Sequence, residues 1–136
     1  MTNSDESSAD QAPPYAEGQV WEYRTRPGEE TSTIQINKIE AHPRLNNIYH
    51  ISIFGVHVVN YHVPGGRVQT RLPHSPVSEQ TLNSSVTRLV DLQTPDPVYL
   101  SGYQEWKRVF DEGKAGIFTI TIAEIVDFVQ HALTPQ

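Results

Sequence analysis

The order of apolar and polar residues predicts a chain that begins with strands and ends with helices. Residues 19–72 repeat apolar side chains at every second position, as in Tyr49, Ile51 and Ile53, which is the period of a strand with one buried face. Residues 78–133 repeat them every three or four positions, which is the period of an amphipathic helix. The predicted fold class is therefore α+β: an antiparallel sheet of about five to six strands with three helices packed on one face.

Turn residues divide the first half of the chain into strands. The predicted strands cover residues 19–25, 31–40, 48–54, 56–63 and 67–72. Pro27-Gly28 suits a type II turn, because proline presets φ at the second position and glycine accepts positive φ at the third. Ile39 breaks the alternation of the second strand, which predicts a bulge near Asn37. Gly55 predicts a bend or bulge between the third and fourth strands.

The two glycines at 65 and 66 are a signal for a tight hairpin. With these glycines at the tip, the paired residues are Val63 with Val68, Tyr61 with Thr70, and Val59 with Leu72. The opposite face of the hairpin then collects the polar side chains of Asn60, His62, Arg67, Gln69 and Arg71. Because one register separates apolar from polar residues on both strands, we expect this hairpin to present a single polar face.

Capping residues and helical spacing predict three helices in the second half of the chain. The first is capped by Ser78 and carries the apolar residues Leu82, Val86, Leu89 and Val90. The second covers residues 101–112 and ends at Gly113. A short buried strand at 116–120 precedes the last helix, which begins with a capping box from Thr121 to Glu124.

Length and composition indicate one small domain behind an acidic tail. The chain has 136 residues, a formal net charge of −6 and no cysteine, which excludes disulfides, thiolate catalysis and cysteine-ligated metals. Residues 1–17 are rich in Ser, Asp and Pro, so we expect a disordered tail followed by a single α+β domain over residues 18–134. The first residues lack the features of a secretory signal, and no apolar run is long enough to span a membrane. We expect a cytoplasmic protein.

The sorting of charge along the chain is the most informative feature for function. Residues 41–78 contain no aspartate or glutamate, yet they hold Arg44, Arg67, Arg71 and five of the six histidines. Carboxylates are the usual partners of arginine and of protonated histidine. A segment without them leaves cationic groups free for an outside anion or an acidic surface. The net negative charge, by contrast, disfavours nucleic acid as a partner.

Catalytic and metal-binding patterns are weak in this sequence. His57 and His62 lie five residues apart, so a regular strand points them to opposite faces, and His42 and His74 stand beside prolines in predicted loops. We therefore favour surface histidines over a metal site, and we expect no cofactor. There is no Gly-x-Ser-x-Gly elbow, cysteine nucleophile or phosphate-binding loop, so no catalytic residue is predicted.

Five short strings occur together in the chain and point to a family. They are GQVWEY at 18–23, RPGE at 26–29, HIS at 50–52, GYQEW at 102–106 and AGIFTI at 115–120. This combination, spread over about residues 18–130, resembles a family of short, uncharacterised bacterial proteins. The resemblance implies a bacterial, stand-alone domain, and it brings no activity, ligand or catalytic residue with it.

Two functions from different classes fit these features. The first is a non-catalytic binding module that acts through the polar hairpin face or through the acidic helical half of the chain. An inhibitor or immunity-type protein that neutralises a basic protein partner is one example, and we expect no membrane or nucleic-acid partner. Its candidate binding residues lie on the polar hairpin face and the neighbouring strand: Asn60, His62, Arg67, Gln69, Arg71 and His50. The second is a small-ligand or phosphate-binding protein, or an enzyme, with a pocket between sheet and helices. A solvated sheet face without function competes with both.

Overall fold

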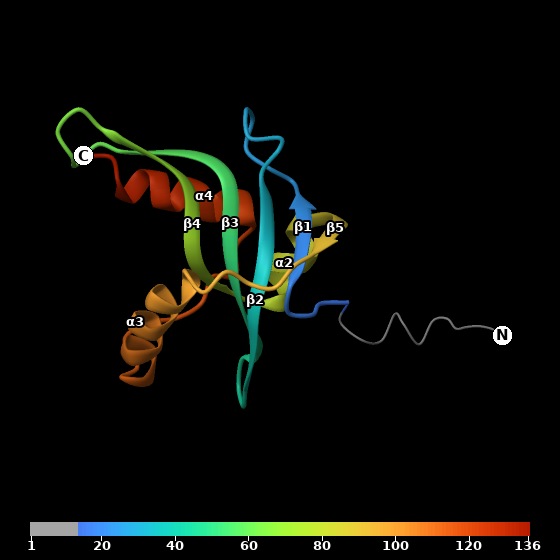
Figure 1. The fold of residues 1–136 in the computed structure, drawn as a ribbon. Helices are drawn as coiled ribbons and strands as arrows, with labels where there is room; N and C mark the ends of the chain where they lie inside the picture. The colour runs from blue at the N-terminus through green and yellow to red at the C-terminus, as the bar shows by residue number, and fades with distance from the viewer. Residues whose placement is uncertain (1–13) are drawn as a thin grey trace.

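The computed structural model describes residues 14–136 and shows one antiparallel sheet of five strands with three helices (Figure 1). The strands lie in the order β4-β3-β2-β1-β5. Their bounds are β1 Gln19–Tyr23, β2 Thr33–His42, β3 Asn46–Asn60, β4 Arg67–Val77 and β5 Val86–Leu92. The helices are α2 Glu79–Ser85, α3 Tyr99–Asp111 and α4 Ile122–Ala132. The predicted α+β class, with its numbers of strands and helices, is confirmed.

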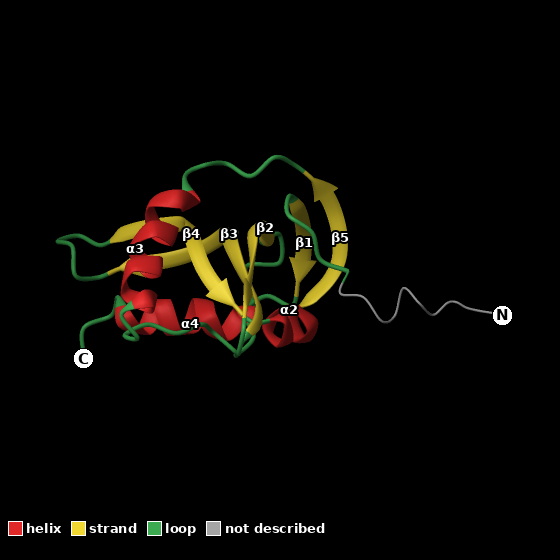
Figure 2. Cartoon of the chain, turned by 90° about the horizontal axis from the view of Figure 1, so that it is seen from below, coloured by secondary structure: helices red, strands yellow, loops and turns green. Residues whose placement is uncertain are grey.

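The main core lies between one face of the sheet and two of the helices. Ile51 and Ile53 of β3 are fully buried in one cluster with Leu82 of α2 and Ile125 of α4. Figure 2 shows α2 and α4 lying along this face of the curved sheet. Burying an aliphatic side chain of this size contributes about 1.5–3 kcal/mol, so this layer dominates the stability of the domain.

The third helix packs on the other face of the sheet. Tyr103 and Trp106 of α3 lie against the ring of His50, with centroids 4.8 Å and 5.0 Å away. His50 precedes Ile51 in β3, and neighbouring residues of a strand point to opposite faces. The sequence predicted all three helices on one face of the sheet. This prediction is wrong for α3, which covers part of the opposite face.

Two bulges bend the long strands where the sequence predicted irregularity. The pairing of β2 with β3 shifts around Asn37, and the pairing of β3 with β4 shifts between Phe54 and Val58. Gly55 lies in the second shift with φ of 79°, and a Cβ there would come within 3.1 Å of Ser32 Cα. Both predictions are confirmed, although residues 46–60 form one bent strand where the sequence predicted two.

The predicted tip of the hairpin was wrong, and so was the register that followed from it. β3 pairs Val59 with Val68, and the loop takes up residues 61–66. Within that loop, Pro64 and Gly65 are the central residues of a turn closed by a 2.8 Å backbone hydrogen bond. Proline presets φ at the first central position, and Gly65 supplies the positive φ of 79° at the second. The proline, which the prediction left outside the turn, moves the turn by one residue, and the wider loop at 61–66 moves the partner of Val68 from Val63 to Val59.

Two further elements differ from the prediction. The first helix ends at Ser85, and Val86 begins strand β5, which pairs antiparallel with β1. Residues with helical spacing thus became an edge strand, because β1 would otherwise leave its backbone groups unpaired. The predicted strand at 116–120 is reduced to a single parallel bridge between Val77 and Phe118.

The last helix begins as predicted. The Thr121 side chain accepts the backbone N–H of Glu124, and the Glu124 side chain accepts the backbone N–H of Thr121, which completes the capping box. None of the helices in the described part of the chain combines the length and apolar character that a membrane span requires.

The structure covers only the end of the predicted tail. Residues 1–13 lie outside the described residues, so the prediction of disorder for them stays a prediction. Tyr15 packs edge-on against Trp21 and Tyr49, with ring centroids 5.7 Å and 5.5 Å away. Its hydroxyl donates to Asn83 Oδ1 at 2.6 Å, and burial, with the nearby charge of Glu79, raises the pKa of Tyr15 to about 12. Tyr15, which the prediction placed in the tail, therefore contacts the folded domain.

Candidate binding surface on the hairpin arm

A hairpin arm projects from the sheet beyond the last pairing between β2 and β3. We define it as residues 56–72, and Figure 1 shows it extending past the other strands beside α4. The pairing of β2 with β3 ends at Thr33 and Phe54. Beyond that point, the Gln130 side chain of α4 accepts the N–H of Val59 at 2.8 Å and donates to its carbonyl at 2.9 Å. One glutamine thus satisfies backbone groups that β2 no longer reaches.

A buried carboxylate fastens the base of the arm. Glu29 is 5% exposed and accepts the backbone N–H of His57 at 2.7 Å and two N–H groups of Arg26 at 3.0 Å and 2.6 Å. Burial alone would raise the pKa of Glu29, but the hydrogen bonds from Arg26 and His57 outweigh burial and hold the pKa below its ordinary value. Arg26 also reaches Asp127 of α4 at 3.3 Å. The predicted turn after β1 thus supplies the group that holds the bulge of β3.

Arg67 and Arg71 are exposed on the arm, and neither forms an ion pair within residues 14–136. β3, β4 and the loop between them contain no aspartate or glutamate. Glu22 is paired with Arg88 at 3.1 Å, and Glu40 with other groups, so neither reaches the arm. The cationic charge of the arm is therefore not neutralised by the described part of the chain.

The bulge at Gly55 separates the pairing partners of two candidate residues of the arm, Gln69 and Arg71. Residues directly opposite each other in an antiparallel ladder share a face. Gln69 pairs with Val58, which is buried in the main core, whereas Arg71 pairs with Phe54, which lies outside that cluster. The register shift around Gly55 falls between these two pairs. Gln69 and Arg71 nevertheless lie two residues apart in β4 and line the same hollow, so the single polar face stays a prediction.

Three of the candidates meet at the outer end of the arm. Asn60 and Arg67 are the last pair of the ladder, and the Asn60 side chain accepts the backbone N–H of His62 at 3.0 Å. The His62 ring lies 3.2 Å from the carbonyl of Ala132 at the end of α4. The structure thus brings Asn60, His62 and Arg67 together, with Arg71 nearer the base of the arm.

His50, the sixth candidate, does not belong to this surface. It is fully buried at the opposite end of β3, where it pairs with Lys38 and Pro76. The prediction that it faces solvent was wrong because α3 covers this part of the outer sheet face.

His50 instead lies in a buried chain of hydrogen bonds. Its Nε2 is 3.0 Å from Glu40 Oε1, and its Nδ1 is 2.9 Å from His74 Nε2. Burial lowers the pKa of His50 despite the opposing effect of Glu40, and burial, reinforced by the neighbouring His50, lowers the pKa of His74 to about 4. Both rings are therefore neutral near pH 7. The His50 Nε2–H donates to Glu40, so its Nδ1 accepts from His74.

α3 closes over these rings. Tyr103 OH donates to Glu40 Oε1 at 3.2 Å, and Lys107 Nζ lies 3.4 Å from Glu40 Oε2. A Cβ on Gly102 would lie 2.9 Å from His74 Cβ, so only glycine allows this approach of helix to strand. We assign this cluster a structural role, because its contacts join α3 to β2, β3 and β4. Sequence reasoning missed it because the prolines around His74 predicted a loop there.

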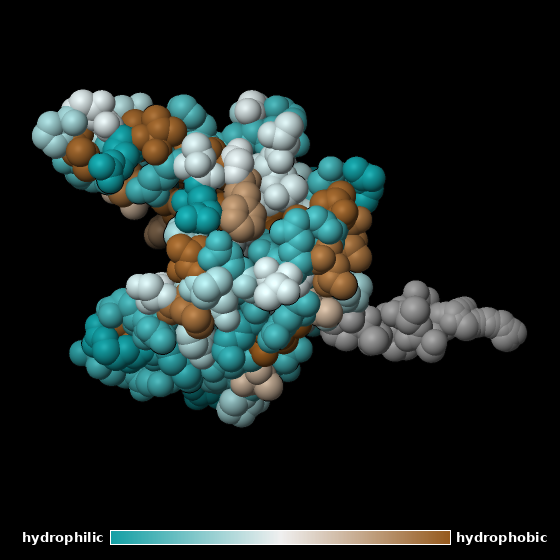
Figure 3. All heavy atoms as spheres, viewed as in Figure 1, coloured by the Kyte–Doolittle hydropathy of each residue, from teal (hydrophilic) through white to brown (hydrophobic). Residues whose placement is uncertain are grey.

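Exposed apolar side chains accompany the cations of the arm. Tyr61 is 54% exposed, Val63 37% and Val68 51%. Figure 3 shows hydrophobic and hydrophilic surface mixed on the lobe that the arm forms. Tyrosine and arginine are both enriched in protein–protein interfaces. Sequence reasoning missed these residues because it placed them on the buried face of the hairpin. The arm, however, extends beyond the helices that would bury them.

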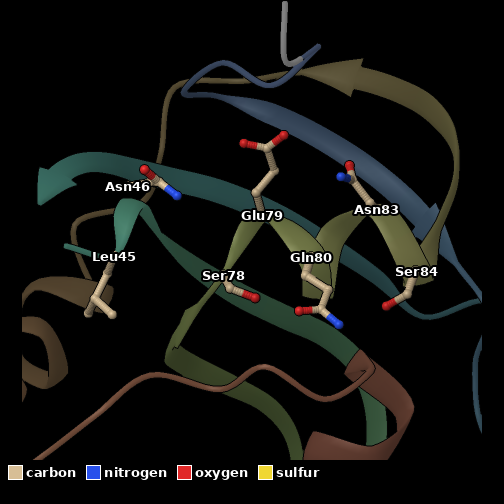
Figure 4. Close-up of a pocket in the computed structure, with 7 residues that line it drawn as sticks. All are labelled: Leu45, Asn46, Ser78, Glu79, Gln80, Asn83 and Ser84. Atoms are coloured by element: carbon tan, nitrogen blue, oxygen red, sulfur yellow. The ribbon is translucent and has the colours of Figure 1, made fainter.

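Two surface hollows bear on the choice between a protein and a small molecule as ligand. One, of about 790 Å³, lies at the base of the arm and is lined by Phe54, Gly55, Gln69, Thr70, Arg71 and Pro73. The other, of about 670 Å³, is lined by Leu45, Asn46, Ser78, Glu79, Gln80, Asn83 and Ser84. Figure 4 shows that Glu79 and Asn83 point away from Gln80 and Ser84, so the polar groups of the second hollow do not converge. The first hollow has one cationic lining residue and the second has none.

Neither a metal centre nor a known relative identifies the site. Within residues 14–136, no group of three or more His, Asp or Glu side chains is placed to hold a metal ion. No family model, curated protein or solved structure matches the chain. The resemblance to a bacterial family therefore stays a prediction.

Proposed function

We propose that the protein is a non-catalytic binding module whose hairpin arm docks onto an acidic surface of a protein partner. The observation that carries this proposal is the pair of exposed arginines, Arg67 and Arg71, on strands that contain no carboxylate. Arginine binds carboxylates through two parallel hydrogen bonds, and such pairs add specificity as well as affinity.

The remainder of the arm supports a protein partner over a small anion. Tyr61, Val63 and Val68 add exposed apolar area beside the cations, which a free phosphate or carboxylate would not cover. The second hypothesis, a small-ligand or phosphate-binding protein, calls for several cationic groups around one cavity. At the base of the arm only Arg71 lines the hollow.

The uneven distribution of charge over the protein, rather than its net charge, fits an inhibitor or immunity-type role. The chain has a net charge of −6, yet its arm is cationic. The acidic patch of a partner is therefore attracted only in the orientation in which it faces the arm. Complementary charge raises the association rate and disfavours wrong partners. We propose a cytoplasmic location and a bacterial origin on the grounds given by the sequence.

Charge reversal on the arm should abolish binding of an acidic ligand. The probe is a capped, fluorescent peptide of three Thr-Glu-Glu repeats, and the readout is fluorescence anisotropy at about 0.15 M salt, the same condition as for the control below. We expect Arg67→Glu with Arg71→Glu to weaken binding by more than about tenfold, because two charge-assisted contacts become repulsive. Both side chains are exposed, so the circular dichroism spectrum should not change.

A matched control separates a local site from net charge. Arg44→Glu with Lys114→Glu makes the same change in charge at two exposed cations outside the arm. This control should bind the peptide within about twofold of the wild type at about 0.15 M salt, where charges beyond the Debye length are screened. Equal losses in the two double variants would contradict the proposal. Competition by inorganic phosphate at the same site would favour the small-anion hypothesis instead.

A further inference from the structure

β4 is an edge strand, and the chain itself already adds backbone to part of that edge. In the sheet order β4 stands at one end. Phe118 forms a parallel bridge with Val77, in which its N–H donates to Pro76 O at 2.9 Å and its carbonyl accepts from Ser78 N–H at 2.9 Å. Next along the strand, α3 closes over His74 at Gly102. The C-terminal part of the β4 edge is therefore covered.

The N-terminal part of the same edge is open. Within residues 14–136, no backbone hydrogen bond outside the ladder with β3 involves residues 67–72. Arg67, Val68, Thr70 and Arg71 are exposed. Unpaired N–H and C=O groups along an edge are a template for another strand. Five residues of strand, about 17 Å long, are available between Arg67 and Arg71.

The opposite edge of the sheet is less suited to accept a strand. β5 has a register shift against β1, and its Arg88 is already paired with Glu22 at 3.1 Å. The Asp91 side chain accepts the N–H of Leu92, the next residue of the same strand. Because Arg88 is already neutralised, it is not available to an acidic strand, whereas Arg67 and Arg71 of β4 form no ion pair within residues 14–136.

We infer that an extended, acidic segment of a partner protein adds as a strand to β4 between Arg67 and Arg71. This inference rests on the proposed function and specifies how the partner binds. Arg67 and Arg71 stand at the two ends of the open stretch of β4, so an added strand passes both guanidinium groups. A segment with carboxylates toward both of its ends is therefore the complementary ligand. The hollow lined by Thr70, Arg71 and Pro73 lies beside this edge and can receive a side chain of the added strand.

Backbone methylation of the probe tests strand addition apart from charge attraction. Two versions of the Thr-Glu-Glu peptide carry backbone N-methyl groups on alternate residues. The first frame methylates the odd-numbered residues and the second frame the even-numbered residues, so both peptides keep every carboxylate. In an added strand only one frame directs its N–H groups toward β4. We expect one version to bind the full-length protein at least about tenfold more weakly than the parent peptide, and the other within about twofold.

Amide exchange gives a second readout on the same complex. Binding of the parent peptide should slow exchange at alternate residues between 67 and 72, whose N–H groups point away from β3. Equal binding by both methylated peptides, with the arginine dependence intact, would overturn strand addition while leaving the proposed function standing. Loss of the arginine dependence would remove the proposed function itself. Concentration-dependent protection of these amides without peptide would assign the edge to a second copy of the chain, and this outcome also overturns the inference.

Discussion

Replacement of Glu29 by alanine is expected to lower the free energy of unfolding by about 3–5 kcal/mol, the cost of breaking a buried ion pair from one side. The Glu29 side chain is 4% exposed and that of Arg26 is 18% exposed, so the guanidinium left behind is largely buried and keeps the exposed carboxylate of Asp127, at 3.3 Å, as its ion-pair partner. The His57 N–H loses its acceptor as well. Urea denaturation followed by circular dichroism measures the change.

Glu30 provides the control for this substitution. It follows Glu29 directly but is exposed, and it accepts the backbone N–H of Gly28 at 2.9 Å. Glu30→Ala should therefore cost less than about 1 kcal/mol. Since Glu29 holds the bulge beneath the arm, its loss should also broaden the amide signals of the arm. A cost for Glu29→Ala no larger than that for Glu30→Ala would show that this carboxylate does not fasten the arm.

Acidification between about pH 6.5 and pH 4 is expected to destabilise the protein, with His74 contributing up to about 3 kcal/mol. The pKa of His74 is lowered to about 4 in the folded protein, and that of His50 is lowered in the same direction. Below about pH 6.5 the histidines of the unfolded chain are therefore protonated while those of the folded chain stay neutral. The free energy of unfolding decreases as the pH is lowered through this range. Above that range neither state protonates these rings, so this contribution is constant.

The charged groups around the two histidine rings also lower the stability of the protein at low pH. Burial raises the pKa of Glu40, but the hydrogen bond from His50 and the charge of Lys107 outweigh burial and leave its pKa below the ordinary value. Its stabilising contribution is therefore complete above about pH 4.5 and is lost as pH falls further. Lys38 of β2 and Lys107 of α3 disfavour a charge on His50, and Tyr103 of α3 is hydrogen-bonded to Glu40.

Urea denaturation at a series of pH values measures this dependence. His74→Gln should reduce the slope between about pH 6.5 and pH 4 by more than half, whereas His131→Gln, at an exposed position on α4, should keep the wild-type slope. If His74→Gln leaves the slope unchanged, the buried histidine cluster is not the cause of the pH dependence of the free energy of unfolding. Trp106, which packs on His50, offers a fluorescence signal for the local change.

Features that depend on neighbouring residues could be predicted from the sequence. The capping box at Thr121, the type II turn at Pro27 and the bulges at Asn37 and Gly55 all follow from local backbone chemistry. The period of the apolar residues was sufficient for the fold class. The lack of an ion-pair partner for Arg67 and Arg71 within the described residues could also be predicted from a local property, the absence of carboxylates in the same segment.

Features that depend on distant residues could not be predicted in this way. Val86 to Leu92 forms a strand because the edge of β1 is available, and that edge is more than sixty residues earlier in the chain. His50 is buried because α3, about fifty residues later, returns across the outer face of the sheet. The pairing of Gln69 and Arg71 with β3 depends on how many residues the bulge at Gly55 takes up, and no local rule specifies that number.

Chemical-shift mapping on the full-length protein tests the central claim most directly. The Thr-Glu-Glu peptide is added to the isotope-labelled protein at low salt, and the backbone amide signals are followed. We expect the largest shifts at residues 58–72, with Arg67 and Arg71 among them, and little change at the exposed cations Arg44 and Lys114. Shifts spread over all cationic positions, or centred on α3, would contradict the assignment of the hairpin arm as the binding surface.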